Sequence, residues 1–217
     1  MDTRLLNCDF TLRHYGETLR DYRTADYEVV SVRDYVKRRP KRALVMRHDL
    51  DIAMDRALNL SAVELEQGCT ATYLVRLHSR YYNPFSYDGT RTLRALLDAG
   101  HEIGFHFEPG MPELMNVPVE KYLAHIRVFF SNLLNTPITV LSQHYAATFR
   151  TQLPPACWLD HWHDVTEDGL NGDGKYLSDS GGRWREGCFC QWVGKADKLF
   201  VLTHPLWWYD KMPQECF

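Results

Sequence analysis

The stretch ALVMRHDLD at residues 43–51 joins a short apolar run to a cluster of charged and imidazole side chains. The apolar half predicts a buried strand, and charged groups at its exit are costly unless they are paired or hold an ion. If the backbone stays extended, Asp49 and Asp51 face one way and His48 the other. Two converging carboxylates can bind a divalent cation or share a proton. Alternatively, one acid caps the helix that follows and the other pairs with Arg47.

On either side of this stretch, apolar runs alternate with helical patterns. Strands are expected at residues 27–30, 43–46, 71–75, 102–107, 138–141, 158–162, 176–177, 189–193 and 199–203. Helices are expected at residues 10–23, 31–38, 52–67, 90–99 and 119–135. This order predicts a mainly parallel α/β domain, either an open sheet or an incomplete barrel. In both architectures the reactive residues lie at the C-terminal ends of the strands.

The composition limits the function classes. A length of 217 residues favours one domain over two, and residues 1–40 are expected to be a mainly helical lead-in. The net charge of −3 is too balanced for electrostatic binding of nucleic acid. No apolar run approaches about 18 residues, so we expect no membrane span. Scattered thiols and no apolar leader after the N-terminus predict a cytoplasmic location.

The cysteines show no C-x-x-C pair. Cys188 and Cys190 are two apart, so both would face one side of the strand expected at residues 189–193. Such a pair is more typical of small buried residues than of half a zinc site.

Several predicted strands deliver a histidine or an acid to the same edge of the sheet. His106 ends one strand, and His144 and His204 each follow another. Taken singly, each is most simply a core or surface histidine, but together with the acids at 49 and 51 they predict a site. The segment SDSGGRW (178–184) adds Asp179 and Arg183, which orient a catalytic group or a substrate, or simply form an Asx-type turn.

These segments, in this order, resemble the motifs of the polysaccharide deacetylase superfamily, the NodB-homology esterases of carbohydrate esterase family four. The matching segments are RHDLD (47–51), GHEIGFH (100–106), LSQH (141–144), SDSGGRW (178–184) and LTHP (202–205). The resemblance covers about residues 8 to 209. The set is also similar to a narrower branch, the WbmS-type proteins encoded with bacterial O-antigen (lipopolysaccharide) biosynthesis. It implies a distorted, incomplete (β/α) barrel and a metal held by one aspartate and two histidines.

The resemblance also implies an activity: deacetylation of an N-acetylated sugar of a surface polysaccharide or its cytoplasmic precursor, a carbohydrate or nucleotide-sugar substrate. The metal would be divalent, with zinc expected before iron, cobalt or nickel. Its implied ligands are Asp49 or Asp51, with His106 and His144.

The remaining roles also follow from the resemblance. His204 would protonate the leaving amine, with Asp179 as the orienting group, and Asp49 or His48 would accept a proton from water. Arg183 or a tryptophan such as Trp184 would hold the sugar. The sequence leaves open whether the chain is a monomer or a homo-oligomer.

One departure from the family pattern concerns the first motif, where two adjacent acids are expected. Here the adjacent pair is His48 and Asp49, and Asp51 lies two positions beyond. In one register Asp49 is the metal ligand and His48 occupies the position of the base. In the other register Asp49 is the base and Asp51 is the ligand.

A second departure concerns the third ligand. The family's second histidine lies four residues after the first, and four after His106 is Gly110. Either His144 or Glu108 replaces it, or the site is weak or empty. An empty site would suit a non-catalytic sugar-binding relative, whereas a filled one would also serve another C–N hydrolase or a phosphoesterase.

Overall fold

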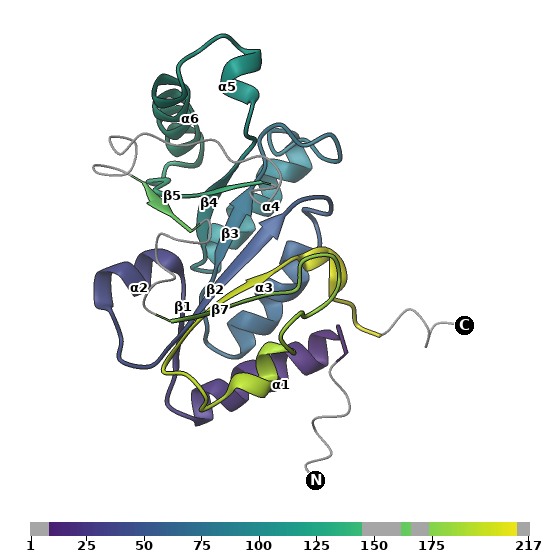
Figure 1. Cartoon of the computed structure of the whole chain (residues 1–217). Coiled ribbons are helices and arrows are strands. Elements are labelled where there is room, and N and C mark those ends of the chain that lie inside the picture. The colour runs from purple at the N-terminus through teal and green to yellow at the C-terminus, as the bar shows by residue number, and fades with distance from the viewer. Residues whose placement is uncertain (1–8, 145–161, 166–173, 212–217) are drawn as a thin grey trace.

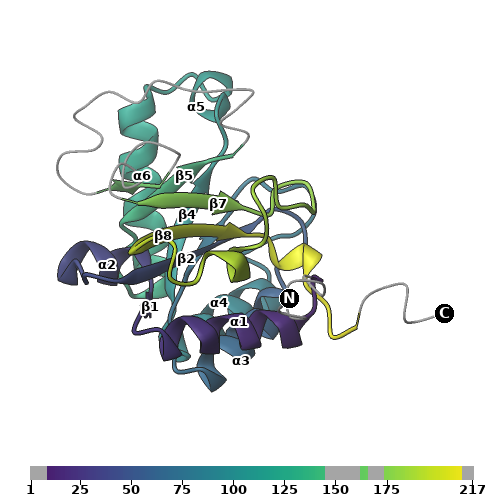
Figure 2. The ribbon, with the colours of Figure 1, turned by 60° about the horizontal axis from the view of Figure 1, so that its bottom comes forward.

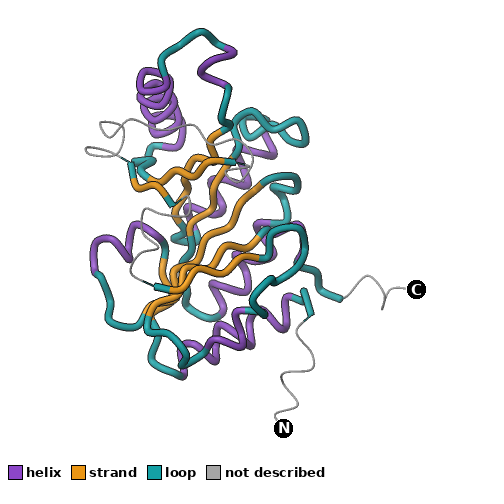
Figure 3. Tube along the Cα trace, in the orientation of Figure 1, coloured by secondary structure: helices purple, strands orange, loops and turns teal. Residues whose placement is uncertain are grey.

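A computed structural model describes residues 9–144, 162–165 and 174–211 (Figure 1). Within these residues eight strands form one sheet in the order β6-β5-β4-β3-β2-β8-β7, and β1 lies beside the first half of β2. Every strand pair is parallel. The sheet curls into an open half-barrel, and Figure 3 shows its strands as one twisted layer. The predicted parallel α/β fold is therefore confirmed.

The element bounds follow the expected alternation. The strands are β1 Glu28–Val30, β2 Ala43–Leu50, β3 Thr72–Val75, β4 Glu102–Phe107, β5 Val140–Gln143, β6 His163–Asp164, β7 Lys175–Ser178 and β8 Lys198–Thr203. The helices are α1 Leu12–Thr24, α2 Val32–Arg38, α3 Ala57–Glu66, α4 Tyr87–Asp98, α5 Met111–Leu114 and α6 Val119–Leu134, with 3₁₀ turns η3 Phe189–Trp192 and η4 Pro205–Trp207. Among the described helices none is both long and apolar enough to cross a membrane.

Hydroxyl caps set the starts of three helices. The side chains of Thr11, Ser31 and Ser86 each accept a hydrogen bond from the backbone N–H three residues on. These bonds satisfy N–H groups that have no partner inside the helix. Helix α3 differs from expectation, because it begins at Ala57 and leaves residues 51–56 as a turn after β2.

The prediction of a strand at residues 189–193 is wrong, because the chain forms a 3₁₀ turn, η3, there. Phe189 is fully buried there, and its carbonyl oxygen accepts a hydrogen bond from the Tyr22 hydroxyl at 2.7 Å. A buried carbonyl satisfied by a side chain needs no strand partner. The strand expected at 158–162 falls almost wholly outside the described residues.

Strand β2 is buried along its whole length and contributes to both faces of the sheet. Leu44 and Met46 belong to the large core that α1, α3, α4 and α6 cover, whereas Ala43 and Val45 belong to a smaller core on the opposite face. Figure 2 shows α1, α3 and α4 together along one side of the sheet. Because side chains alternate, the acid at position 49 faces the smaller core and the histidine at 48 faces the helices.

Gly104 allows the strands to approach closely on the smaller-core face. A Cβ atom there would lie 2.4 Å from Leu74 Cδ2 and 2.8 Å from the Val140 carbonyl oxygen. Both distances are shorter than real Cβ contacts, so only glycine fits. The glycine therefore lets side chains of β3 and β5 close over β4 two residues before His106.

Candidate metal centre and active site

Three side chains meet at the C-terminal ends of β2, β4 and β5. The Nε2 atom of His106 lies 3.3 Å from Asp51 Oδ1, and the Nε2 atom of His144 lies 3.6 Å from the same oxygen. One ligand atom from each residue fits within a 4.8 Å group. Ligands about 2.1 Å from a zinc ion stand about 3.4 Å apart in a tetrahedron. The spacing therefore matches three corners of a metal site.

In both histidines a hydrogen bond at Nδ1 determines where the lone pair of Nε2 points. His106 Nδ1 lies 3.1 Å from the Ser142 carbonyl oxygen, and His144 Nδ1 lies 3.1 Å from Glu108 Oε2. Since both oxygens only accept, we assign the protons to Nδ1. Both Nε2 atoms then direct lone pairs at Asp51, as metal-binding histidines do when a carbonyl or carboxylate holds the other nitrogen.

Asp51 supplies the matching anion. Its Oδ1 atom is buried and accepts no hydrogen bond from the described residues, while the side chain as a whole is 23% exposed. An unpartnered buried carboxylate oxygen is costly. The N···O separations of 3.3 and 3.6 Å are also longer than the roughly 2.7–2.9 Å of charged N–H···O bonds. The residues present therefore fit a divalent cation.

Asp49 is bound differently from Asp51. Arg47 donates to both of its oxygens, Nε to Oδ1 at 2.8 Å and Nη2 to Oδ2 at 2.7 Å. Burial works to raise the pKa of Asp49, but the charge of Arg47, followed by that of His106, holds that pKa well below its usual range. Asp49 Oδ2 also lies 3.3 Å from His106 Nε2. The geometry thus places Asp51 between the imidazoles and keeps Asp49 as an ionised neighbour.

His204 and Asp179 form a second pair at the same edge. His204 Nδ1 lies 2.6 Å from Asp179 Oδ1, and Asp179 Oδ2 accepts bonds from the His204 backbone N–H and from Trp208 Nε1–H. Burial lowers the pKa of His204, but the hydrogen bond and charge of Asp179 outweigh it and raise the pKa to about 9. With Nε2 at 3.6 Å from Asp51 Oδ2, a protonated His204 can donate a proton beside the metal position.

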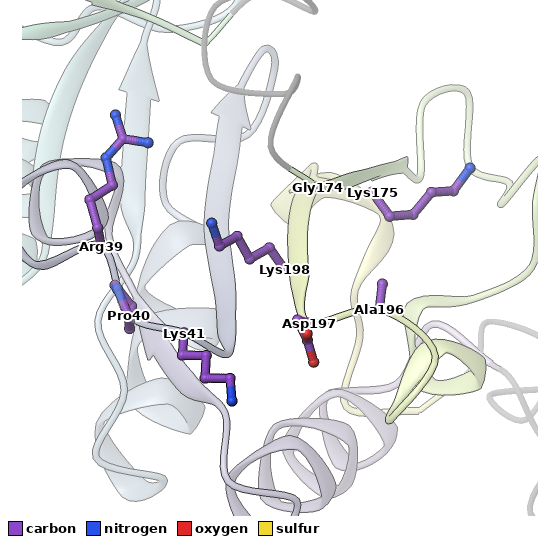
Figure 4. Close-up of a pocket in the computed structure, with 8 residues that line it drawn as sticks. All are labelled: Arg39, Pro40, Lys41, Gly174, Lys175, Ala196, Asp197 and Lys198. Atoms are coloured by element: carbon purple, nitrogen blue, oxygen red, sulfur yellow. The ribbon is translucent and has the colours of Figure 1, made fainter.

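A small cavity of about 50 Å³ opens beside these groups, with Asp49, Asp51, His204 and Trp207 in its wall. The indole Nε1 of Trp207 is buried, and it has no hydrogen-bond partner in the part of the chain that the structure describes. A larger hollow of about 670 Å³ (Figure 4) lies at the opposite edge, where Lys175 and Lys198 begin β7 and β8. The larger hollow is therefore separate from the strand-end cluster.

The structure brings six of the predicted site residues to this edge, namely Asp49, Asp51, His106, His144, Asp179 and His204. It does not bring His48 there. That imidazole is fully buried on the helix-covered face, 2.6 Å from Thr203 Oγ1 and 2.7 Å from Glu64 Oε1. The alternation of side chains along β2 separates it from both neighbouring acids, so it occupies no base position.

The two residues expected to hold the sugar lie elsewhere in the turn after β7. Arg183 is exposed, and its backbone N–H bonds to the Asp179 carbonyl. The ring of Trp184 packs against Phe189, with centroids 5.6 Å apart, at the edge of the large core. A structural role therefore accounts for Trp184.

Sequence reasoning missed Arg76, which contacts the carboxylate that holds His144. Its Nε donates to Glu108 Oε1 at 2.5 Å, and Glu108 in turn holds His144. Arg76 directly follows β3, so the rule that located the other strand-end residues would also have found it.

Comparison with known proteins gives one distant structural likeness. No protein-family profile and no curated protein matches the chain. Among solved structures it is similar to the deacetylase PplD of Streptococcus pyogenes, determined in complex with acetate. The two share 10% identity and a TM-score of 0.46, over 65% of this chain and 67% of that one.

Proposed function

We propose that this chain is a metal-dependent hydrolase of the polysaccharide deacetylase type. One observation carries the proposal. Asp51, His106 and His144 lie at the ends of β2, β4 and β5, and one ligand atom of each lies within 4.8 Å of the others, while an oxygen atom contacts the Nδ1 atom of each imidazole. Groups arranged in this way repel one another unless a cation lies among them. The proposed cation is divalent, with zinc expected because nitrogen and oxygen ligands at this spacing suit it.

The proposed reaction is hydrolysis of an amide, which uses the neighbouring side chains. When bound, the ion would polarise the amide carbonyl and lower the pKa of water. Asp49, kept ionised by Arg47, would accept a proton from the attacking water. Hydroxide would add to the acyl carbon, the C–N bond would break, and His204 would give its Nε2 proton to the leaving amine. Asp179 would hold His204 in the orientation that this transfer needs.

The proposed substrate is an N-acetylated sugar or nucleotide-sugar used for a surface polysaccharide such as O-antigen. The ordered motifs of the sequence support this substrate class. The cavity beside Asp51 and His204 is small, about 50 Å³, which favours a short acyl group over a long one.

Metal content tests the proposal directly. Protein purified without a metal-affinity tag would be measured by mass spectrometry beside His106→Ala and His144→Ala. The exposed histidine of α6 gives a matched control, His125→Ala. Both cluster variants should lose one metal equivalent that the control keeps, and only metal-loaded wild type and control should release acetate from N-acetyl sugars. Saturable sugar binding without metal or turnover would instead identify a non-catalytic relative.

A further inference from the structure

A second group of metal-ligand atoms lies away from the strand-end cluster. It consists of His14 on α1 with Cys188 and Cys190 at the start of η3. His14 Nε2 is 3.4 Å from Cys188 Sγ, and one ligand atom from each of the three residues fits within a 4.8 Å group. Figures 1 and 2 show the yellow-green turn that carries η3 lying along α1. The group therefore joins two segments 174 positions apart in the chain.

The spacing suits a tetrahedral ion. A thiolate sulfur about 2.3 Å and an imidazole nitrogen about 2.1 Å from zinc would stand about 3.6 Å apart, close to the observed 3.4 Å. Two sulfurs and one nitrogen form a softer ligand set than the aspartate and histidines of the first cluster. Such a set prefers zinc over magnesium, calcium or manganese.

The three side chains are shielded from solvent to different degrees. His14 is 9% exposed and Cys188 is 3% exposed, whereas Cys190 is only partly buried. Neither Cys188 nor Cys190 is in a disulfide within the described residues.

Cys188 belongs to the large core and Cys190 packs against it, as expected for small buried residues, and both also lie beside one imidazole. The turn that replaces the expected strand buries Cys188 to 3% exposure and brings the half-buried Cys190 to the same imidazole. Phe189, between the two cysteines, is the residue that fills the core against Tyr15 and Tyr22. The sulfurs on either side of it can therefore act as ligands.

We propose that His14, Cys188 and Cys190 bind a structural zinc ion that fastens α1 to the turn between β7 and β8. A water or an acidic neighbour would take the fourth position. The same turn begins with Asp179, so the ion would steady the segment that orients His204. This site does not depend on the proposed activity, because none of its ligands belongs to the strand-end cluster.

Cobalt substitution of the full-length protein tests the site. A Co²⁺ ion bound by thiolate gives a sulfur-to-metal charge-transfer band in the near ultraviolet, which an aspartate–histidine site does not give. Wild type should show the band, and so should His106→Ala, even though that variant loses the strand-end metal. The double variant Cys188→Ser/Cys190→Ser should lose the band and one metal equivalent, and His14→Ala should weaken metal binding at least tenfold.

The control is Cys69→Ser, which removes a buried thiol whose Sγ lies by the Gln67 carbonyl. It should keep both the band and the metal. A band that persists in the double cysteine variant would overturn the proposal. So would wild type that shows no band while circular dichroism shows it folded, or thiol counting that finds Cys188 and Cys190 joined in a disulfide.

Discussion

At the scale of single residues, Asp49 and Asp51 show how neighbours assign different roles to identical side chains. Both are carboxylates on the same face of the chain, two positions apart. Arg47 occupies both oxygens of Asp49, whereas Asp51 Oδ1 meets only imidazole nitrogens. A group already satisfied by a guanidinium gains little from a metal, while an unsatisfied oxygen gains much.

Replacing each acid by its amide should therefore separate binding from stability. Asp51→Asn should reduce metal affinity at least tenfold with little change in unfolding free energy. Asp49→Asn should keep the metal but leave Arg47 buried without a counter-ion, which costs about 3–5 kcal/mol. Metal titration and urea unfolding would measure the two effects, with the exposed Asp55→Asn as control. Loss of metal binding in Asp49→Asn, with metal binding kept in Asp51→Asn, would identify Asp49 as the ligand.

The His204–Asp179 pair allows a second test at this scale. Asp179→Asn should leave metal content unchanged and lower kcat by about 10²-fold or more, the usual contribution of a positioned acid. The reason is that the pKa of about 9 at His204 depends on the Asp179 hydrogen bond and charge. Trp208→Phe removes only the bond that the indole Nε1–H donates to Asp179 Oδ2 and should cost less. Equal losses in both variants would indicate disturbed packing rather than lost acid catalysis.

At the scale of elements, the site depends on strands that end at a common edge of the sheet. In each strand, successive side chains point to opposite faces as far as the last residue. Strand β2 continues through Leu50 instead of stopping at Met46, so Asp49 is held by pairing with β3. Strand β4 presents Gly104 and His106 on the same face. Because Gly104 has no side chain, Leu74 and the Val140 carbonyl can lie close against the backbone of β4.

Gly104→Ala tests that packing. The added methyl would lie 2.4 Å from Leu74 Cδ2 and 2.8 Å from a backbone oxygen, so strands β3 and β5 must shift. We expect a loss of about 1–3 kcal/mol in unfolding free energy, measured by urea denaturation, and weaker metal binding because His106 moves with its strand. A change below about 0.5 kcal/mol would show that the sheet relaxes without cost.

At the scale of the whole molecule, a buried polar network fastens the helices to the sheet beneath the site. Glu64 on α3 accepts hydrogen bonds from Tyr15 on α1 and Tyr73 on β3, and its Oε1 lies 2.7 Å from His48 Nε2 on β2. All four side chains are fully buried. Burying polar groups costs little folding free energy when each has a hydrogen-bond partner. Removing one member of the network leaves the other buried groups without a partner. This network places the His48 imidazole on the face of the sheet that the helices cover.

The network predicts acid sensitivity. Burial raises the pKa of Glu64, but His48 and its other partners outweigh this effect and hold the pKa below the usual 4.5. Its contribution to stability is thus complete above pH 4.5 and is lost as pH falls through the lowered pKa. Burial also lowers the pKa of His101 below 6.5, so protonation favours the unfolded chain below that pH. Unfolding free energy should therefore fall on acidification from pH 6.5 downward.

Urea unfolding between pH 7 and pH 3 would measure this loss. Glu64→Gln should be less stable at pH 7 and should lose less on acidification below pH 4.5. The control Glu66→Gln removes an exposed acid of the same helix and should follow wild type. Parallel pH curves for wild type and Glu64→Gln would contradict the assignment.

The sequence alone determined the order of most strands and helices, because apolar periodicity reflects backbone geometry within a few residues, but it mistook η3 for a strand and gave no sign of α5. It also determined that positions 49 and 51 share a face, since alternation along an extended chain is a local property. The strand-end rule then located His106, His144 and His204. Cytoplasmic location, substrate class and oligomeric state stay predictions.

The tertiary structure decided which of these groups meet. His144 stands beside His106 because β4 and β5 are neighbours in the sheet, and no local pattern encodes strand order. Arg47 binds both oxygens of Asp49, and Asp51 is the acid that lies together with His106 and His144. The meeting of His14 with Cys188 joins segments 174 positions apart. Such contacts are set by how the whole chain buries its apolar surface, which no short stretch of sequence specifies.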